Sequence, residues 1–269
     1  MKHAEILAAA MSVAAFAAMA DVSVVRDIPY RPGDADPYAA EACRLDVKTP
    51  AAATGFPTVV WFHGGGLVNG RRHFIKIDDS IAQVAVGYRL LGTNGLVRGE
   101  ACIEDAAAAV AWTLRGIAAY GGDPRRVYVS GMSAGGYLTM MVGMAPKYLA
   151  RHGFKPTDLA GIAPVSGQAT THFNVRKFAG DTDPQYRPKI DDLAPLRWVG
   201  KDLPPIISIC GQPTMEWPCR SEENKLLVAS CVALGHKWAR FAELPHCDHG
   251  RVFVAGVPYV EMFVKGRMP

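Results

Sequence analysis

The chain has 269 residues, 49% of them hydrophobic and 20% charged, and its formal net charge is +4. This length accommodates one full-sized domain, and the composition is that of a soluble globular protein. No run of lysine and arginine accompanies the modest positive charge, so nothing in the sequence indicates a nucleic-acid partner.

The first 20 residues have the features of an export signal. Lys2 precedes an alanine-rich apolar run, and Ala18-Met19-Ala20 offers small residues for cleavage. We expect a signal peptide at 1–20, a mature chain at 21–269, a periplasmic or secreted location, and no stable membrane insertion after cleavage. A buried helix or a retained anchor is the alternative, although the apolar run is short for a span of ~20 residues.

Strand-like and helix-like segments alternate along the mature chain. Short β-like runs at 22–28 and 44–47 flank a turn-rich segment, which predicts an antiparallel hairpin at a sheet edge. The alternation that follows predicts an α/β fold in one domain, with a mostly parallel sheet and helices on both faces. Strands are predicted at 58–62, 81–88, 126–130, 160–165, 205–210 and 237–244. Helices are predicted at 101–120, from after Gly136 to about Met144, at 221–234 and at 250–265, the last interrupted near Pro258, and residues 166–203 are expected to be irregular.

The sequence Gly131-Met132-Ser133-Ala134-Gly135 joins a predicted strand to a predicted helix. A serine on so tight a turn adopts a strained backbone, and side chains at the flanking glycines would collide with the neighbouring strand and helix. The turn aims the hydroxyl of Ser133 at the positive end of the helix. The pattern is also found in ordinary glycine-rich β–α turns, so the rest of the chain has to decide.

A second glycine-rich stretch, His63-Gly64-Gly65-Gly66, follows the strand predicted at 58–62. Successive glycines leave their N–H groups unshielded, and those of Gly64 and Gly65, beside that of Ala134, are suited to hold a developing oxyanion. His63 is expected to fix the loop by hydrogen bonding rather than to act as a base. A phosphate-binding loop is disfavoured because no Lys-Ser or Lys-Thr follows the glycines.

A serine hydroxyl needs a base, and the base needs a carboxylate to orient it. The loop after the last predicted strand contains His246 and His249. We favour His249, because glycine and a helix follow it. The loop after the strand at 205–210 contains one carboxylate before the next helix, that of Glu216. Other candidate acids are Glu222 and, third, Asp248. A metal site involving these histidines is weakly supported, because they do not lie on an extended helix.

The chain order serine, acid, histidine is that of an α/β-hydrolase. The chain resembles the α/β-hydrolase superfamily, and within it the esterase/lipase group with a His-Gly-Gly-Gly oxyanion motif, which includes members like hormone-sensitive lipase and the feruloyl and acetylxylan esterases. The resemblance covers nearly the whole mature chain. The matching stretches are Trp61–Gly66, Glu104-Asp105, Tyr120–Pro124, Gly131–Gly136, Thr171–Arg176, Ile190–Pro195 and Asp248-His249-Gly250.

The resemblance implies an exported serine carboxylesterase that works through an acyl-enzyme and needs no metal or organic cofactor. Its substrate would be a small-molecule or carbohydrate-linked ester, such as an acylated plant polysaccharide. An exopeptidase or lactonase with the same triad, or a non-catalytic binding protein on this fold, is the alternative. His172 and Phe173 are candidates for lining the pocket, with packing as the other role. The sequence does not indicate the oligomeric state.

The chain departs from many relatives at Thr214, where they carry an aspartate, and the run from Gly70 to Ile81 is too short for the usual helix. The six cysteines are an even number, as disulfides in an oxidising compartment would require, and none forms a Cys-x-x-Cys pair. A disulfide between Cys219 and Cys247 would tie the acid loop to the histidine loop.

Overall fold

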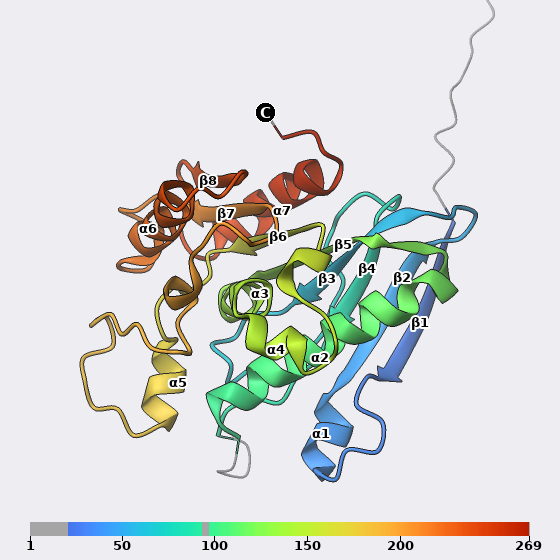
Figure 1. Cartoon of the computed structure of the whole chain (residues 1–269), viewed down its shortest axis with the longest axis horizontal. Coiled ribbons are helices and arrows are strands. Elements are labelled where there is room, and N and C mark those ends of the chain that lie inside the picture. The colour runs from blue at the N-terminus through green and yellow to red at the C-terminus, as the bar shows by residue number, and fades with distance from the viewer. Residues whose placement is uncertain (1–20, 93–96, 269) are drawn as a thin grey trace, which may run out of the picture.

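The computed structural model describes residues 21–92 and 97–268, and within them one eight-stranded sheet is the central element (Figure 1). The strand order is β1-β2-β4-β3-β5-β6-β7-β8. The predicted signal peptide at 1–20 lies outside the described residues. The strands are β1 (Val22–Pro29), β2 (Arg44–Pro50), β3 (Phe56–Phe62), β4 (Ala82–Val86), β5 (Gly122–Met132), β6 (Gly161–Val165), β7 (Ile206–Gly211) and β8 (Ala239–Leu244).

Most of the sheet is parallel, as predicted. β4, β3, β5, β6, β7 and β8 pair in parallel, whereas β2 pairs antiparallel with both β1 and β4. The predicted N-terminal hairpin is therefore present. Every residue of β3 is buried, which agrees with its continuously apolar sequence. The carboxyl ends of all the parallel strands lie on the same side of the molecule, and the loops after β3, β5, β7 and β8 meet there.

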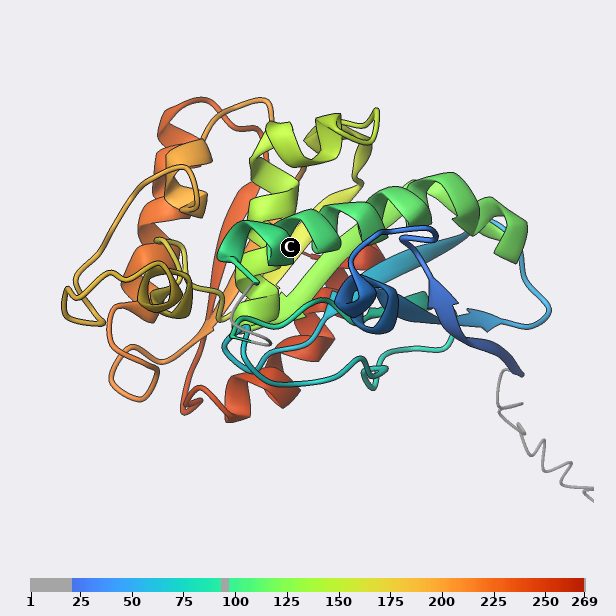
Figure 2. The same cartoon turned by 90° about the horizontal axis from the view of Figure 1, so that it is seen from below.

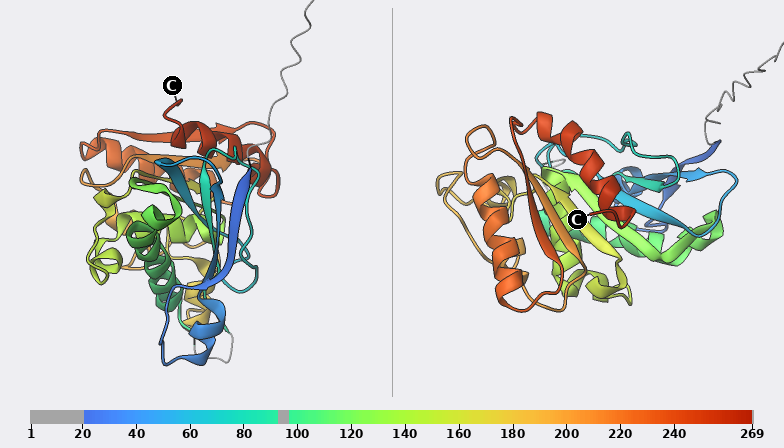
Figure 3. Two further views of the ribbon diagram at one scale, coloured as in Figure 1. Left: turned by 90° about the vertical axis from the view of Figure 1, so that its right-hand side faces the viewer. Right: turned by 90° about the horizontal axis from the view of Figure 1, so that it is seen from above.

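Helices cover both faces of the sheet. One apolar cluster packs α2, α3, α4 and α6 against one face, and a second packs α7 and the segment around Ile75–Ile81 against the other. Figure 2 shows α2 crossing the first face, and Figure 3 shows α6 and α7 on opposite sides of β7 and β8. The α-helices are α1 (Pro37–Ala42), α2 (Gly99–Gly116), α3 (Ala134–Met144), α4 (Pro146–Ala150), α5 (Phe173–Phe178), α6 (Arg220–Ala233) and α7 (Arg251–Val264), and the 3-10 turns are Ile117–Tyr120, Pro156–Asp158 and Pro195–Trp198.

Two sequence predictions were wrong in detail. The segment 166–203, expected to be irregular, contains α5 and a 3-10 turn. The last helix was expected to break near Pro258, but α7 runs through this residue. The hydrogen bond that proline removes would have ended on the carbonyl of Val254, a residue that is 73% exposed, so water can take its place. Buried Val257, Val260 and Phe263 hold the helix on both sides of the proline.

Candidate active site

Ser133 lies at the turn between β5 and α3, with a backbone conformation that a non-glycine residue rarely adopts. Its φ and ψ are 57° and −113°. A Cβ atom at Gly131 would lie 2.7 Å from the carbonyl oxygen of Phe62 in β3, and one at Gly135 would overlap the same oxygen. The two glycines therefore let the turn pack directly on the neighbouring strand, as the sequence predicts.

The structure brings His249 and Glu216 to this serine from two other loops. The Nε2 atom of His249 lies 2.9 Å from the Oγ atom of Ser133, and Nδ1 lies 2.6 Å from Oε1 of Glu216. These contacts fit the imidazole tautomer that donates from Nδ1 to the carboxylate and accepts a hydrogen bond from the serine hydroxyl at Nε2. The carboxylate of Glu216 is fully shielded from water, and the side chain of His249 is 17% exposed.

Of the three candidate acids, Glu216 alone contacts the histidine. Glu222 lies in the first turn of α6 and is exposed. Asp248 accepts hydrogen bonds from the N–H groups of Gly250 and Arg251, at 3.0 and 2.8 Å. Its carboxylate therefore stabilises the start of α7.

Ser166 belongs to the same cluster, although the sequence analysis did not select it. Its hydroxyl donates to Oε2 of Glu216 at 2.7 Å and lies 3.0 Å from Nδ1 of His249. Its φ is 47°, and the guanidinium of buried Arg220 donates to its carbonyl at 2.5 Å. The available signal was its position directly after β6, at the carboxyl end of a parallel strand.

Hydrogen bonds keep the Glu216 carboxylate ionised despite its position. Burial raises the pKa of Glu216. The hydrogen bonds from His249, from the backbone N–H of Trp217 and from Ser166 outweigh burial, so the pKa lies below the ordinary value of a glutamate. The acid is therefore charged when it faces the histidine at neutral pH.

The predicted oxyanion loop lies against the serine. A Cβ atom at Gly64 would be 3.5 Å from that of Ser133, and Gly65 has a φ of +99°. Within the described part of the chain, the N–H groups of Gly64 and Gly65 have no recorded acceptor. The N–H of Ala134 belongs to the first residue of α3 and has no partner within that helix. The three N–H groups thus belong to two turns that lie against each other next to Ser133.

His63 fixes this loop, as expected from the sequence. Its ring stacks on Tyr88 with centroids 4.4 Å apart, and its Nδ1 lies 2.7 Å from the carbonyl of Gly64. The hydroxyl of Tyr88 donates to the carbonyl of His63 at 2.9 Å. Burial lowers the pKa of His63 to about 4, so the ring is neutral.

The two candidate pocket residues differ in their surroundings. His172 is 1% exposed, packs between Tyr137 and Phe173, and accepts a hydrogen bond from the N–H of Asn174 at the start of α5. Its environment is that of a packed core residue. Phe173 is half-buried and contacts Trp217, whose ring stacks on His249.

The hypothetical disulfide between Cys219 and Cys247 is absent, and both residues are free thiols. Cys219 is exposed at the start of α6, with a φ of 64°. The two loops are joined by hydrogen bonds instead. The N–H of Gln212 donates to the carbonyl of Cys247, and the N–H of His246 donates to the side chain of Gln212, both at 2.9 Å.

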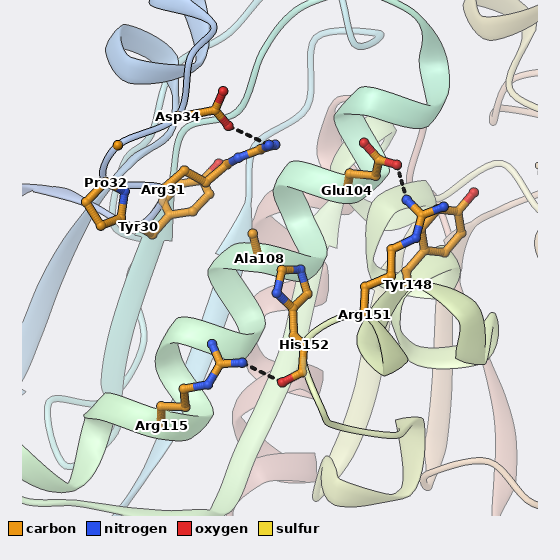
Figure 4. A pocket seen from close by; sticks show the side chains of 11 residues that line it. Tyr30, Arg31, Pro32, Asp34, Glu104, Ala108, Arg115, Tyr148, Arg151 and His152 are labelled. Carbon is orange, nitrogen blue, oxygen red and sulfur yellow. Dashed lines mark hydrogen bonds and ion pairs between the residues drawn. The ribbon is translucent and has the colours of Figure 1, made fainter.

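A hollow of about 500 Å³ lies elsewhere, over α2 and α4, and contains none of the predicted site residues (Figure 4). Three arginines line it, but each guanidinium already has a protein partner. Arg31 pairs with Asp34 and Asp105, Arg151 pairs with Glu104, and Arg115 donates to the carbonyl of His152.

Residues 21–92 and 97–268 contain no cluster of three His, Cys, Asp or Glu side chains suited to a metal ion. The same residues contain no helix long and apolar enough to cross a bilayer.

The sequence profile of the BD-FAE family matches residues 45–215, more than half of the chain. The chain belongs to the BD-FAE family. The matched segment includes the oxyanion loop and Ser133, and it ends just before Glu216. The predicted relationship to α/β-hydrolases of the esterase type is confirmed.

Curated relatives of this BD-FAE member are similar over a part of their length. An acylcarnitine hydrolase of Mus musculus is 35% identical over 115 residues, which are 37% of this chain and 20% of the relative. A phenmedipham hydrolase of Pseudarthrobacter oxydans is 30% identical over 122 residues, 41% of this chain and 24% of the relative. The chain thus spans about a fifth to a quarter of the length of these relatives.

Solved structures match the fold over nearly the whole chain. A truncated carbohydrate esterase from gut microbiota has a TM-score of 0.70 at 18% identity, covering 91% of this chain and 96% of its own. The propionate-bound esterase Est2 of Thermogutta terrifontis has a TM-score of 0.67 at 20% identity, covering 92% and 94%. At these identities the likeness confirms the predicted α/β-hydrolase fold.

Proposed function

We propose that this protein is a serine carboxylesterase, with Ser133 as nucleophile, His249 as general base and Glu216 as the orienting acid. The observation that carries the proposal is the continuous hydrogen-bonded chain from Ser133 through His249 to Glu216, on a turn that strains the serine. The names of the relatives and of the structural neighbours support ester hydrolysis. Carbohydrate-linked and small carboxylic esters are the proposed substrate classes.

In the first half of the reaction, the proton of Ser133 passes to Nε2 of His249 as the serine oxygen attacks the ester carbonyl. The N–H groups of Gly64, Gly65 and Ala134 stabilise the oxyanion. His249 then gives the proton to the leaving alcohol, and the acyl group remains on the serine. A water molecule, deprotonated by the same histidine, releases the acid and restores the hydroxyl.

The proposal is tested with Ser133→Ala and His249→Ala on p-nitrophenyl acetate. Each substitution should lower kcat by about a thousandfold or more, because the triad acts as a unit. The matched control is His246→Asn, since His246 lies three residues before His249, is exposed, and has a φ of 58° that asparagine tolerates. The control should keep the parent rate. Unchanged hydrolysis by Ser133→Ala, or faster cleavage of matched amides than of esters, would contradict the proposal.

A further inference from the structure

Trp217 directly follows the proposed acid Glu216, and it contacts both Glu216 and His249. Its backbone N–H donates to Oε1 of Glu216 at 2.9 Å. Its indole ring stacks on the imidazole of His249, with centroids 4.7 Å apart and an interplanar angle of 25°. The ring of Phe173 contacts that of Trp217, with centroids 5.7 Å apart. We call Trp217 and Phe173 the aromatic wall.

The position of the wall relative to His249 fixes which half of the substrate it meets. In the proposed reaction His249 gives its proton to the leaving alcohol, so the alcohol oxygen must lie beside Nε2 of this ring. The acyl oxygen points instead toward the N–H groups of Gly64, Gly65 and Ala134. A side chain stacked on the imidazole is therefore next to the alcohol part of the ester.

Part of the Trp217 side chain is exposed to solvent. The residue remains 38% exposed, although His249, Phe173 and the guanidinium of Arg220 contact its ring. No described residue accepts a hydrogen bond from the indole N–H of Trp217. The polar side chains of Gln212 and Thr214 lie in the same loop and hydrogen-bond to each other at 2.8 Å. The wall thus combines an aromatic surface with a free donor and polar neighbours.

A pyranose ring has the complementary chemistry. Its C–H groups carry small positive charges that suit the negative face of an aromatic ring, and its hydroxyls accept and donate hydrogen bonds at the edge. We infer that the aromatic wall, and Trp217 above all, recognises the alcohol part of the ester and selects a sugar ring over a short linear alcohol. This inference rests on the proposed function, because the reaction places the alcohol beside His249.

The experiment compares two acetyl esters that differ in the alcohol, acetylated xylotriose and ethyl acetate, on the parent chain and on Trp217→Leu. Leucine keeps apolar bulk and loses the aromatic ring. The value of KM for acetylated xylotriose should rise about tenfold or more, the usual loss when a tryptophan anchor is truncated. Because Trp217 stacks on His249, kcat can fall by a similar factor on both esters, so KM is the discriminating constant. The KM for ethyl acetate should change less than threefold, and Trp217→Phe should recover part of the sugar ester's KM.

A matched control is Trp112→Leu, the same substitution at a half-buried tryptophan of α2, which should affect neither substrate. If Trp217→Leu lowers kcat equally on both esters and raises neither KM selectively, Trp217 only supports His249 and the inference is overturned. Unchanged KM values for both esters would overturn it as well.

A binding measurement tests the aromatic wall independently of whether the protein is an esterase. Calorimetry with acetylated xylotriose on Ser133→Ala, and on Ser133→Ala combined with Trp217→Leu, measures recognition without turnover. Tenfold weaker binding in the double variant supports the wall even if the parent chain hydrolyses neither ester, an outcome that would refute the proposed function alone. Equal binding in the two variants would refute the wall even if the parent chain is an active esterase.

Discussion

Ser166→Ala is the most informative substitution for the way the site is held together. The hydroxyl of Ser166 contacts Oε2 of Glu216 at 2.7 Å and Nδ1 of His249 at 3.0 Å. Alanine fits the same space and removes both contacts. Because φ is 47°, the serine and the alanine are strained alike, so the comparison isolates the hydroxyl.

The expected effect follows from the charge on its partner. A hydrogen bond to a charged group contributes about 1.5–3 kcal/mol, and about 1.4 kcal/mol corresponds to a factor of ten. In the proposed mechanism Glu216 stabilises the cation that His249 becomes, so the loss is concentrated in the transition state. We expect kcat on p-nitrophenyl acetate to fall about ten- to a hundredfold, with KM nearly unchanged.

The assay needs a control for stability, and Ser130→Ala provides it. Ser130 is equally buried, and its hydroxyl donates to the carbonyl of Ala163 at 2.6 Å rather than to the acid. Both alanine variants should lose Tm, but Ser166→Ala alone should lose kcat. Ser166→Gly should match the alanine variant in kcat and lose less Tm, because glycine relieves the strain. If kcat in Ser166→Ala equals that of Ser130→Ala, the hydroxyl has no role in aligning the acid.

The remaining predictions concern the acid and the buried histidines. Glu216→Gln should lower kcat on the order of 10³–10⁴-fold, whereas Glu222→Gln should stay within twofold of the parent; similar losses in both would contradict the assignment. Burial lowers the pKa of His63 to about 4 and that of His172 to about 3, against ~6.5 in the unfolded chain. Between these pH values the unfolded chain binds protons that the folded chain excludes, so the free energy of unfolding should fall as the pH drops below about 6.5. Urea denaturation should show a fall of up to ~1.4 kcal/mol per pH unit for each histidine. His63→Gln should reduce this slope, and an unchanged slope would contradict the reasoning.

Short sequence motifs were enough to predict the two glycine-rich turns of the site, which directly follow β3 and β5. The glycines around Ser133 and after His63 have a steric reason for their identity, and the fold follows from alternating buried strands and helices. Glu216 could be ranked first because its loop contains no other carboxylate before α6.

Contacts between segments distant in sequence could not be predicted in this way. Ser166 lies 50 residues from Glu216 and 83 from His249, and only the pairing of β6 between β5 and β7 brings them together. The absence of the Cys219–Cys247 disulfide has the same origin, because the separation and orientation of two loop residues depend on the whole sheet.

The placement of the site on the sheet has a consequence for how activity is lost. Ser133 and the oxyanion loop follow the adjacent interior strands β5 and β3, whereas His249 follows β8, which is the edge strand. Edges open more readily than interiors, since an edge strand pairs on one side only. Under the proposed mechanism, hydrolysis therefore depends on the least protected strand of the parallel region. The catalytic rate is a local probe of that edge and is expected to decline before the bulk of the sheet unfolds.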